Sequence, residues 1–220
     1  MISKRLNLIA SFLSKNDKVL DVGTDHALLP IYLIKNNLVS RADGSDISDK
    51  VLLHARSNVE KYNLSEKINL YLSDGTKNIN IKEYNTLVIC GMGFHTIKHI
   101  LDETNLDNIE KLIIQTNNHY SDLRSLINKL NYQIASENYI CDANKDYLIF
   151  NIVKGYQDLT DTDIICGLYN KNNVEYYNKQ IVKLEKLLSK VNIKEKKELI
   201  INKINIYKEY LIKEKTEEKK

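Results

Sequence analysis

The chain has few cysteines, a single proline and no long apolar run. Its three cysteines, Cys90, Cys141 and Cys166, lie far apart and form no CxxC pair. A disulfide framework and a cysteine zinc site are therefore not expected, and a reducing, cytoplasmic location is the default. No apolar run approaches the roughly 18–20 residues that a membrane-spanning helix needs. The N-terminal apolar stretch is short and lacks a small-residue cleavage site, so we predict no signal peptide.

The charge is close to balanced, with a formal net charge of +3 over 220 residues. Residues 1–155 carry 18 basic and 18 acidic side chains, whereas residues 156–220 carry 14 basic and 11 acidic ones. The C-terminal part therefore holds the whole excess, which neither requires nor excludes a nucleic-acid partner. The length suits one α/β domain plus a smaller appendage.

Apolar runs typical of strands alternate with helical patterns through the first 155 residues. The predicted strands cover 18–22, 42–46, 68–72, 86–90 and 112–115, and the predicted helices cover 27–37, 48–62, 95–102 and 120–130. This order indicates a parallel sheet with helices on both faces. Two further runs, 132–141 and 147–153, have no helix between them. We expect them to form an antiparallel pair that closes the edge of a mainly parallel, seven-stranded sheet.

The last 65 residues follow a different pattern, with no glycine after Gly167. Apolar side chains step by three and four residues from Val174 to Val191 and again from Ile200 to Leu211. This spacing is that of an a/d seam. It predicts an α-helical coiled-coil hairpin of two antiparallel helices that turns near Asn192. We expect the final residues, 213–220, to fray.

The first candidate site segment is VLDVGTDHALLP, residues 19–30, where a predicted strand ends at Asp21. Gly23 allows a tight turn and a close approach of the backbone to a ligand. The segment has one glycine where a dinucleotide-binding loop has three, so a pyrophosphate is a poor fit. Asp21 and Asp25 instead suit a ligand that carries positive charge, such as the methionine part of S-adenosylmethionine, and His26 can hydrogen-bond its carboxylate.

Polar and glycine residues follow the next strands in the same way. Asp46 lies 23 residues beyond Gly23, where a carboxylate can accept both hydroxyls of a ribose. Asp74, in Ser73-Asp74-Gly75, is placed to receive the amino group of an adenine. The order and spacing together favour an S-adenosylmethionine-dependent methyltransferase. The predicted cofactor-binding residues are Asp21, Gly23, Thr24, His26, Asp46, Ile47, Ser73, Asp74, Gly75, Gly91 and Met92.

At these motifs the sequence resembles the bacterial tRNA (adenine-22-N1)-methyltransferases. The resemblance covers roughly residues 3–155 and is carried by SKRL at 3–6, DVGTDHALLP at 21–30, SDG at 73–75, CGMG at 90–93 and QTNN at 115–118. It implies a Rossmann-like class I methyltransferase fold, S-adenosylmethionine as cofactor and tRNA as partner. The domains would then be a catalytic domain, 1–155, and a helical domain, 156–220. The family usually shows GMGG and QPN, where this chain has Phe94 and Thr116.

The resemblance implies methyl transfer to N1 of an adenine inside folded tRNA, which requires the base to be opened or flipped. Asp25 is our first candidate for offsetting the positive charge that forms on the base, and Asn117 our second, at the Watson–Crick edge. As substrate-binding residues we name Phe94 and Tyr120, for stacking, and Arg5, for phosphates.

The C-terminal hairpin has two open interpretations. Its lysines at 179, 183, 186 and 190 fall near one helical face and can meet tRNA phosphates, or the hairpin only stabilises the fold or pairs with a second copy. The oligomeric state stays open, with a monomer as the starting expectation. We expect no membrane partner.

We predict no metal. His95 and His99 have the spacing of a metal pair, but HTIKH lacks the glutamate of HExxH and a third ligand. Two alternative functions stay open as well. One is methylation of another RNA site or of a small molecule. The other is a non-catalytic RNA-binding module with a cofactor fold, which the residues Phe94 and Thr116 leave possible.

Overall fold

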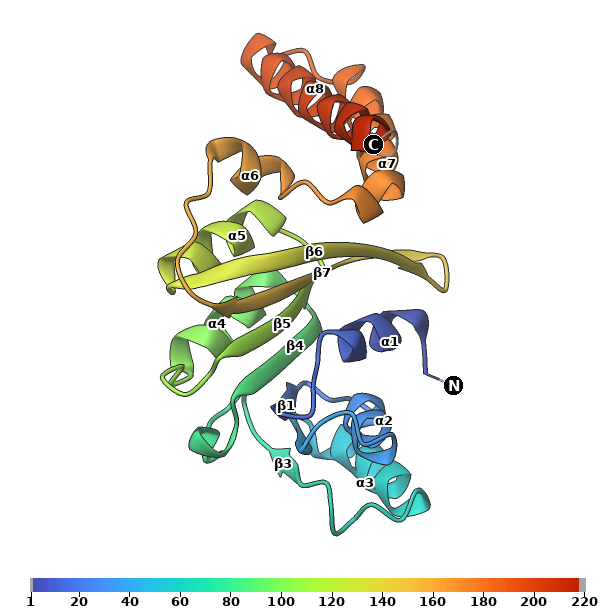
Figure 1. The fold of residues 1–220 in the computed structure, drawn as a ribbon, viewed down its shortest axis with the longest axis vertical. Helices are drawn as coiled ribbons and strands as arrows, with labels where there is room; N and C mark the ends of the chain where they lie inside the picture. The colour runs from blue at the N-terminus through green and yellow to red at the C-terminus, as the bar shows by residue number, and fades with distance from the viewer. Residues whose placement is uncertain (1, 218–220) are drawn as a thin grey trace.

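A computed structural model describes residues 2–217 as a seven-stranded sheet with helices on both faces (Figure 1). The strand order is β3-β2-β1-β4-β5-β7-β6, in which β1 to β5 run parallel and β7 runs antiparallel to both β5 and β6. This arrangement confirms the mainly parallel sheet and its antiparallel closing pair. The strands are β1 (Lys18–Val22), β2 (Arg41–Asp46), β3 (Leu70–Leu72), β4 (Thr86–Met92), β5 (Lys111–Thr116), β6 (Tyr132–Asp142) and β7 (Lys145–Lys154).

Each face of the sheet is covered by its own set of helices. Side chains of β4 alternate between the two faces, so that Val88 packs toward one and Leu87 and Ile89 toward the other. On the Val88 side lie α1 (Lys4–Ser11), α2 (Leu28–Lys35) and α3 (Asp49–Lys61), and on the opposite side lie α4 (Phe94–Glu103) and α5 (Tyr120–Lys129). The burial on both faces explains why most of the strands are rich in apolar residues, whereas β2 (RADGSD) buries small and polar side chains such as Asp43 and Ser45.

The C-terminal part forms the predicted hairpin of two antiparallel helices, α7 (Val174–Leu188) and α8 (Lys194–Glu217), beyond a short helix α6 (Asp161–Cys166). Ile181, Ile200, Ile204 and Tyr207 of the two predicted seams are buried between the helices and the domain. The hairpin is therefore confirmed, and Figure 1 shows it at the end of the molecule beyond β6 and α5.

A buried ion pair between α5 and β6 lies at the base of the hairpin. Arg124 of α5 donates from Nη2 to Oε2 of Glu137 on β6 at 2.7 Å, and both side chains are at most 2% exposed. The Glu137 carbonyl accepts the side-chain amides of Asn170 and Asn173 at 2.9 and 2.8 Å. Gly167 must be glycine, because a Cβ there would lie 2.6 Å from Arg124 Nη2 and its φ is +90°. These contacts fix the base of the hairpin on the domain.

Three details differ from the sequence-based expectations. Helices α1 and α6, of 8 and 6 residues, were not predicted. The tail was expected to fray from residue 213, but α8 continues as a helix to Glu217, and residues 218–220 lie outside the described part. The division at residue 155 stays a prediction. Within residues 2–217, no helix is both long and apolar enough to cross a membrane.

Candidate active site

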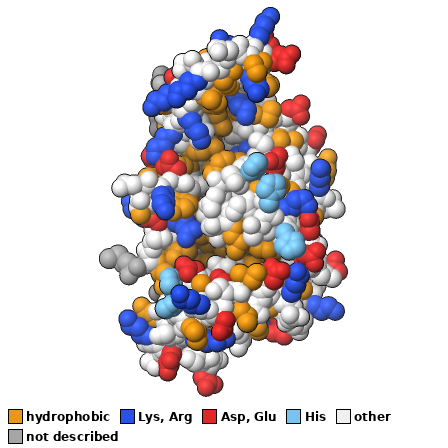
Figure 2. All heavy atoms as spheres, turned by 180° about the vertical axis from the view of Figure 1, so that it is seen from behind, with side chains coloured by type: hydrophobic (Ala, Val, Ile, Leu, Met, Phe, Trp, Pro, Cys, Tyr) orange, Lys and Arg blue, Asp and Glu red, His pale blue; other side chains and the backbone are white. Residues whose placement is uncertain are grey.

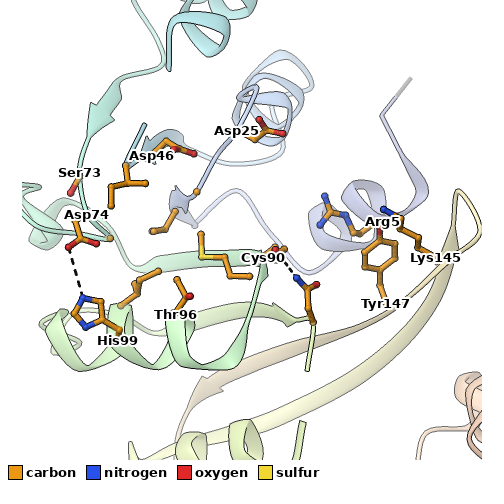
Figure 3. Close-up of a pocket in the computed structure, with 18 residues that line it drawn as sticks. Arg5, Asp25, Asp46, Ser73, Asp74, Cys90, Thr96, His99, Lys145 and Tyr147 are labelled. Carbon is orange, nitrogen blue, oxygen red and sulfur yellow. Dashed lines mark hydrogen bonds and ion pairs between the residues drawn. The ribbon is translucent and has the colours of Figure 1, made fainter. Parts of the chain in front are cut away.

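A cavity of about 780 Å³ lies at the carboxyl ends of β1, β2 and β4 (Figure 3). Loops that follow parallel strands meet at this edge of an open sheet, which is where such folds bind ligands. Arg5, Asp25 and Asn117 line the cavity. So do eight of the eleven predicted cofactor residues: Gly23, Asp46, Ile47, Ser73, Asp74, Gly75, Gly91 and Met92.

The turn after β1 is held against β2. The N–H groups of Gly23 and Thr24 both donate to the Ser45 carbonyl, at 2.8 and 2.9 Å. Gly23 has a φ of +76°, and a Cβ there would lie 2.1 Å from Met92 Cε. Any side chain at position 23 would therefore fill the floor of the cavity as well as strain the turn.

Asp21 lies behind this turn and is 7% exposed. Its Oδ2 accepts a hydrogen bond from Thr24 Oγ1 at 2.8 Å. Burial raises the pKa of the Asp21 carboxyl to about 6, although the Thr24 hydrogen bond and the charge of Arg5 act in the opposite direction. A positive ligand nearby favours the ionised carboxylate, so binding and proton loss are coupled at this residue.

Two further carboxylates lie at the opposite wall. Asp46 ends β2, and its Oδ1 accepts the Ser48 N–H at 2.9 Å. Asp74, in the loop after β3, accepts from Lys77 Nζ at 2.9 Å and lies 4.0 Å from His99 Nε2. The hydrogen bond from Lys77 lowers the pKa of Asp74, so this carboxylate is ionised at neutral pH.

The third wall combines β4, β5 and α1 in one hydrogen-bond network. Gln115 Oε1 accepts from the Gly91 N–H at 3.1 Å and from Arg5 Nη1 at 3.3 Å. Asn117 donates from Nδ2 to the Gly91 carbonyl at 3.0 Å and accepts from Gln115 Nε2 at 3.1 Å. Arg5 also stacks over the Tyr147 ring, 5.1 Å from its centre. One N–H and one lone pair of the Asn117 amide remain for a ligand.

Three predicted cofactor residues do not line the cavity. Asp21 and Thr24 pair with each other beneath the turn. His26 does not line the cavity and lies beside His54, with 6.0 Å between the ring centres, and 3.6 Å from Asp25 Oδ1. Asp25 and Ala27, on either side of it, both have positive φ. These residues support the turn, whereas Gly23 and Asp25 face the ligand space.

Phe94 and Thr116, the two residues that differ from the usual family pattern, have different surroundings. Phe94 is 7% exposed and packs in the core, so its ring offers no open face for a base. Thr116 is fully buried, and its hydroxyl donates to the Asn118 carbonyl at 2.9 Å, which holds the turn after β5. Tyr120 is half-buried and lies on the far side of Asn117, outside this cavity.

Several lining residues were missed by the sequence reasoning. Thr96, His99 and Ile100 come from α4, and Lys145 and Tyr147 come from the start of β7. The helical period of α4 could have placed His99 one turn beyond Thr96, but nothing local indicates that β7 returns to this edge.

Cys90 lines the cavity, and burial raises the pKa of its thiol to about 12, so it stays protonated at neutral pH. Among residues 2–217, no three His, Cys, Asp or Glu side chains are grouped to hold a metal ion.

The fold and this cavity define a class of protein. Residues 2–150 match the family model described as a methyltransferase domain. The chain is 33% identical over 159 residues to the tRNA (adenine(22)-N(1))-methyltransferase of Bacillus subtilis, covering 71% of this chain and 67% of that protein. The chain belongs to this tRNA (adenine-N1)-methyltransferase family. The resemblance found in the motifs is thereby confirmed, together with the methyltransferase class.

Solved structures agree with this assignment over nearly the whole chain. One is M. capricolum TrmK in complex with S-adenosyl-homocysteine, with 34% identity, a TM-score of 0.82, and coverage of 96% of this chain and 97% of that chain. Another is Streptococcus pneumoniae Sp1610 in complex with S-adenosyl-L-methionine, with 34% identity, a TM-score of 0.85, and coverage of 96% and 100%. Since the coverage extends past residue 155, both share the C-terminal hairpin with this chain.

Proposed function

We propose that this protein transfers a methyl group from S-adenosylmethionine to N1 of adenine 22 in tRNA. The observation that carries the proposal is the carboxylate-lined cavity at the switch edge of the sheet, in a chain of this family. Such a reaction on tRNA favours action in the cytoplasm.

The cavity has the donor set that this cofactor requires. Asp46, whose Oδ2 has no partner among the described residues, suits the ribose hydroxyls, and Asp74 with Ser73 suits the adenine amino group. Gly23 and Gly91 leave backbone where side chains would fill the space. Ile47, Gly75 and Met92 complete the walls. When bound, S-adenosylmethionine supplies a methyl group on a positively charged sulfur, which the Asp21 and Asp25 carboxylates offset.

The reaction requires little of the protein beyond the positioning of the cofactor and the adenine base. Adenine N1 carries a lone pair and needs no general base, so the chain must hold the base and stabilise the charge that develops on it. Asp25 is 70% exposed at the cavity mouth, where its carboxylate can accept the adenine amino group and offset that charge. Asn117, fixed by Gly91 and Gln115, keeps one donor and one acceptor for the Watson–Crick edge.

We expect the tRNA to approach over the hairpin side of the cavity. Figure 2 shows Lys and Arg side chains gathered over the hairpin end of the molecule. Lys179 is already paired with Asp146 and Glu175, whereas Lys183, Lys186 and Lys190 are exposed and free to meet phosphates. Arg5 is held inside the cavity by Gln115, so its charge acts on a ligand there rather than on the outer phosphates.

The test is methyl transfer to unmodified tRNA with labelled cofactor, followed by nucleoside analysis. We expect 1-methyladenine at position 22, and a tRNA with guanosine at that position should stay unlabelled. Label at another base, or only in a small molecule, would replace the specific assignment. Cofactor binding without any transfer would favour the non-catalytic RNA-binding alternative.

Asp25 is tested by Asp25→Ala and Asp25→Asn in the same assay. Because a carboxylate is required to offset charge on the base, both should lower kcat by a factor on the order of 10² or more. Asparagine tolerates the positive φ of this position, 52°, so that Asp25→Asn separates the loss of charge from strain in the turn. Unchanged turnover would remove Asp25 from the mechanism. S-adenosylhomocysteine binding serves as the control for folding.

A further inference from the structure

A second cavity, of about 660 Å³, lies beside the cofactor cavity. It is bounded by the start of α5, the ends of β6 and β7 that meet in their hairpin, and one face of α7. Asn117 and Tyr147 line both cavities and form the partition between them. A ligand in the second cavity would therefore lie directly next to the methyl-transfer site.

Aromatic rings dominate the walls of this second cavity. Tyr120, Tyr139, Tyr147 and Tyr176 line it, and three of them are only partly buried. The Tyr120 ring is supported from behind by Phe150, at 6.2 Å between centres. The Tyr147 ring is supported by the Arg5 guanidinium. Supported rings with an open face are the surfaces on which proteins stack unpaired nucleic-acid bases.

The cations at the rim are not equivalent. Lys179 Nζ lies 2.7 Å from Asp146 Oδ1 and 3.0 Å from Glu175 Oε1, so its charge is largely neutralised. Lys183, one helical turn further on α7, lines the same cavity and has no ion-pair partner within residues 2–217. The cavity thus offers a free positive charge at its edge, where a phosphate can lie while its base is inside.

We propose that this second cavity binds a nucleotide of the tRNA that neighbours the target adenosine. The proposal rests on the proposed function. Methylation at N1 requires an unpaired adenine turned out of its stack, which also unstacks the flanking base. Stacking of that base on Tyr120 and Tyr147, with its phosphate at Lys183, replaces the lost stacking. The partition of Asn117 and Tyr147 then separates the target base from its neighbour.

The contribution of the second cavity to tRNA affinity is tested by measuring tRNA binding in the presence of S-adenosylhomocysteine. Tyr120→Leu and Lys183→Ala should each raise the Kd for unmodified tRNA by about five- to tenfold. Tyr120→Phe keeps the ring and should stay within about twofold, because the Tyr120 hydroxyl makes no hydrogen bond within the described chain. Lys61→Ala removes an exposed charge from the far end of the molecule, at the end of α3, and should change nothing. All four variants should bind S-adenosylhomocysteine like the parent, which verifies folding.

The location is tested by a photo-crosslinker, p-benzoylphenylalanine, at Gln180, which lines the cavity from α7. We expect crosslinks to the nucleotides that flank position 22. Crosslinks confined to a distant part of the tRNA, or unchanged tRNA affinity in both Tyr120→Leu and Lys183→Ala, would overturn the inference. If the parent protein itself neither binds nor methylates tRNA, the proposed function fails instead, so the two failures are distinguishable.

Discussion

Asp21 is the residue at which protonation and folding are coupled most directly. The folded protein keeps its proton up to about pH 6, whereas the unfolded chain releases it at the ordinary aspartate value of 3.8. The folded state therefore binds more protons between these values, and the free energy of unfolding falls as pH rises through them. A difference of about two pKa units corresponds to about 3 kcal/mol.

Asp21→Asn should remove this fall in the free energy of unfolding with rising pH. The variant is expected to match the parent near pH 4 and to exceed its unfolding free energy by up to about 3 kcal/mol above pH 6, since an amide oxygen can still accept the Thr24 hydrogen bond. Urea unfolding of the ligand-free protein between pH 4 and 8 measures the difference. Asp158→Asn, at an exposed carboxylate that does not act on Asp21, is the matched control. A difference between Asp21→Asn and the parent that does not vary with pH would contradict the coupling.

Sequence patterns located the acidic residues of the site but not the direction of every side chain. Asp46 and Asp74 were predictable because parallel strands deliver their carboxyl ends to one edge of the sheet. The absence of His26 from the cavity lining was not, since the positive φ of its neighbours Asp25 and Ala27 cannot be read from the sequence. Tyr147 was missed because its place beside Arg5 is set by the long-range pairing of β7 with β5.

At the scale of elements, the Arg124–Glu137 pair holds α5, β6 and the base of the hairpin together. Removing one partner leaves a buried charge without compensation, which costs about 3–5 kcal/mol. Arg124→Met should therefore lower the unfolding free energy by that amount, and Arg124→Met with Glu137→Met should lower it by less. Urea denaturation measures both. Lys98→Met breaks the exposed pair with Asp102 on α4 and should have little effect. Equal losses in the single and double variants would show that the charge is not the cause.

The elements themselves were largely predictable. Strands β1, β4, β5 and β7 carry apolar runs, and helices α7 and α8 carry a long a/d period, so local pattern and burial agree there. Helix α6 has only 6 residues, too few to establish a period, and the 8 residues of α1 mix polar and apolar side chains, unlike the almost wholly apolar α2 of the same length. The length of α8 was underestimated, because the sequence after Ile212 is mostly charged and carries no apolar seam.

At the scale of the whole molecule, we propose that the hairpin provides the cations for a long polyanion. Each lysine that contacts a phosphate adds about one to the slope of log Kd against log salt. The double variant Lys183→Ala and Lys186→Ala should therefore reduce this slope by about two, with cofactor affinity unchanged. Titrations of tRNA at several salt concentrations give the slope. An unchanged slope would mean that the hairpin serves only the fold.

The close packing of Gly167 against Arg124 also fixes the orientation of the hairpin at its base. Helix α8 has 24 residues, a length of roughly 36 Å, so a rotation of about 5° at its base displaces its far end by about 3 Å. A methyl group at Gly167 would lie 2.6 Å from Arg124 Nη2, so the packing at the base of the hairpin would have to change. A change of one small residue, far from the cofactor, is therefore expected to alter how the hairpin presents the lysines that we propose meet the tRNA phosphates.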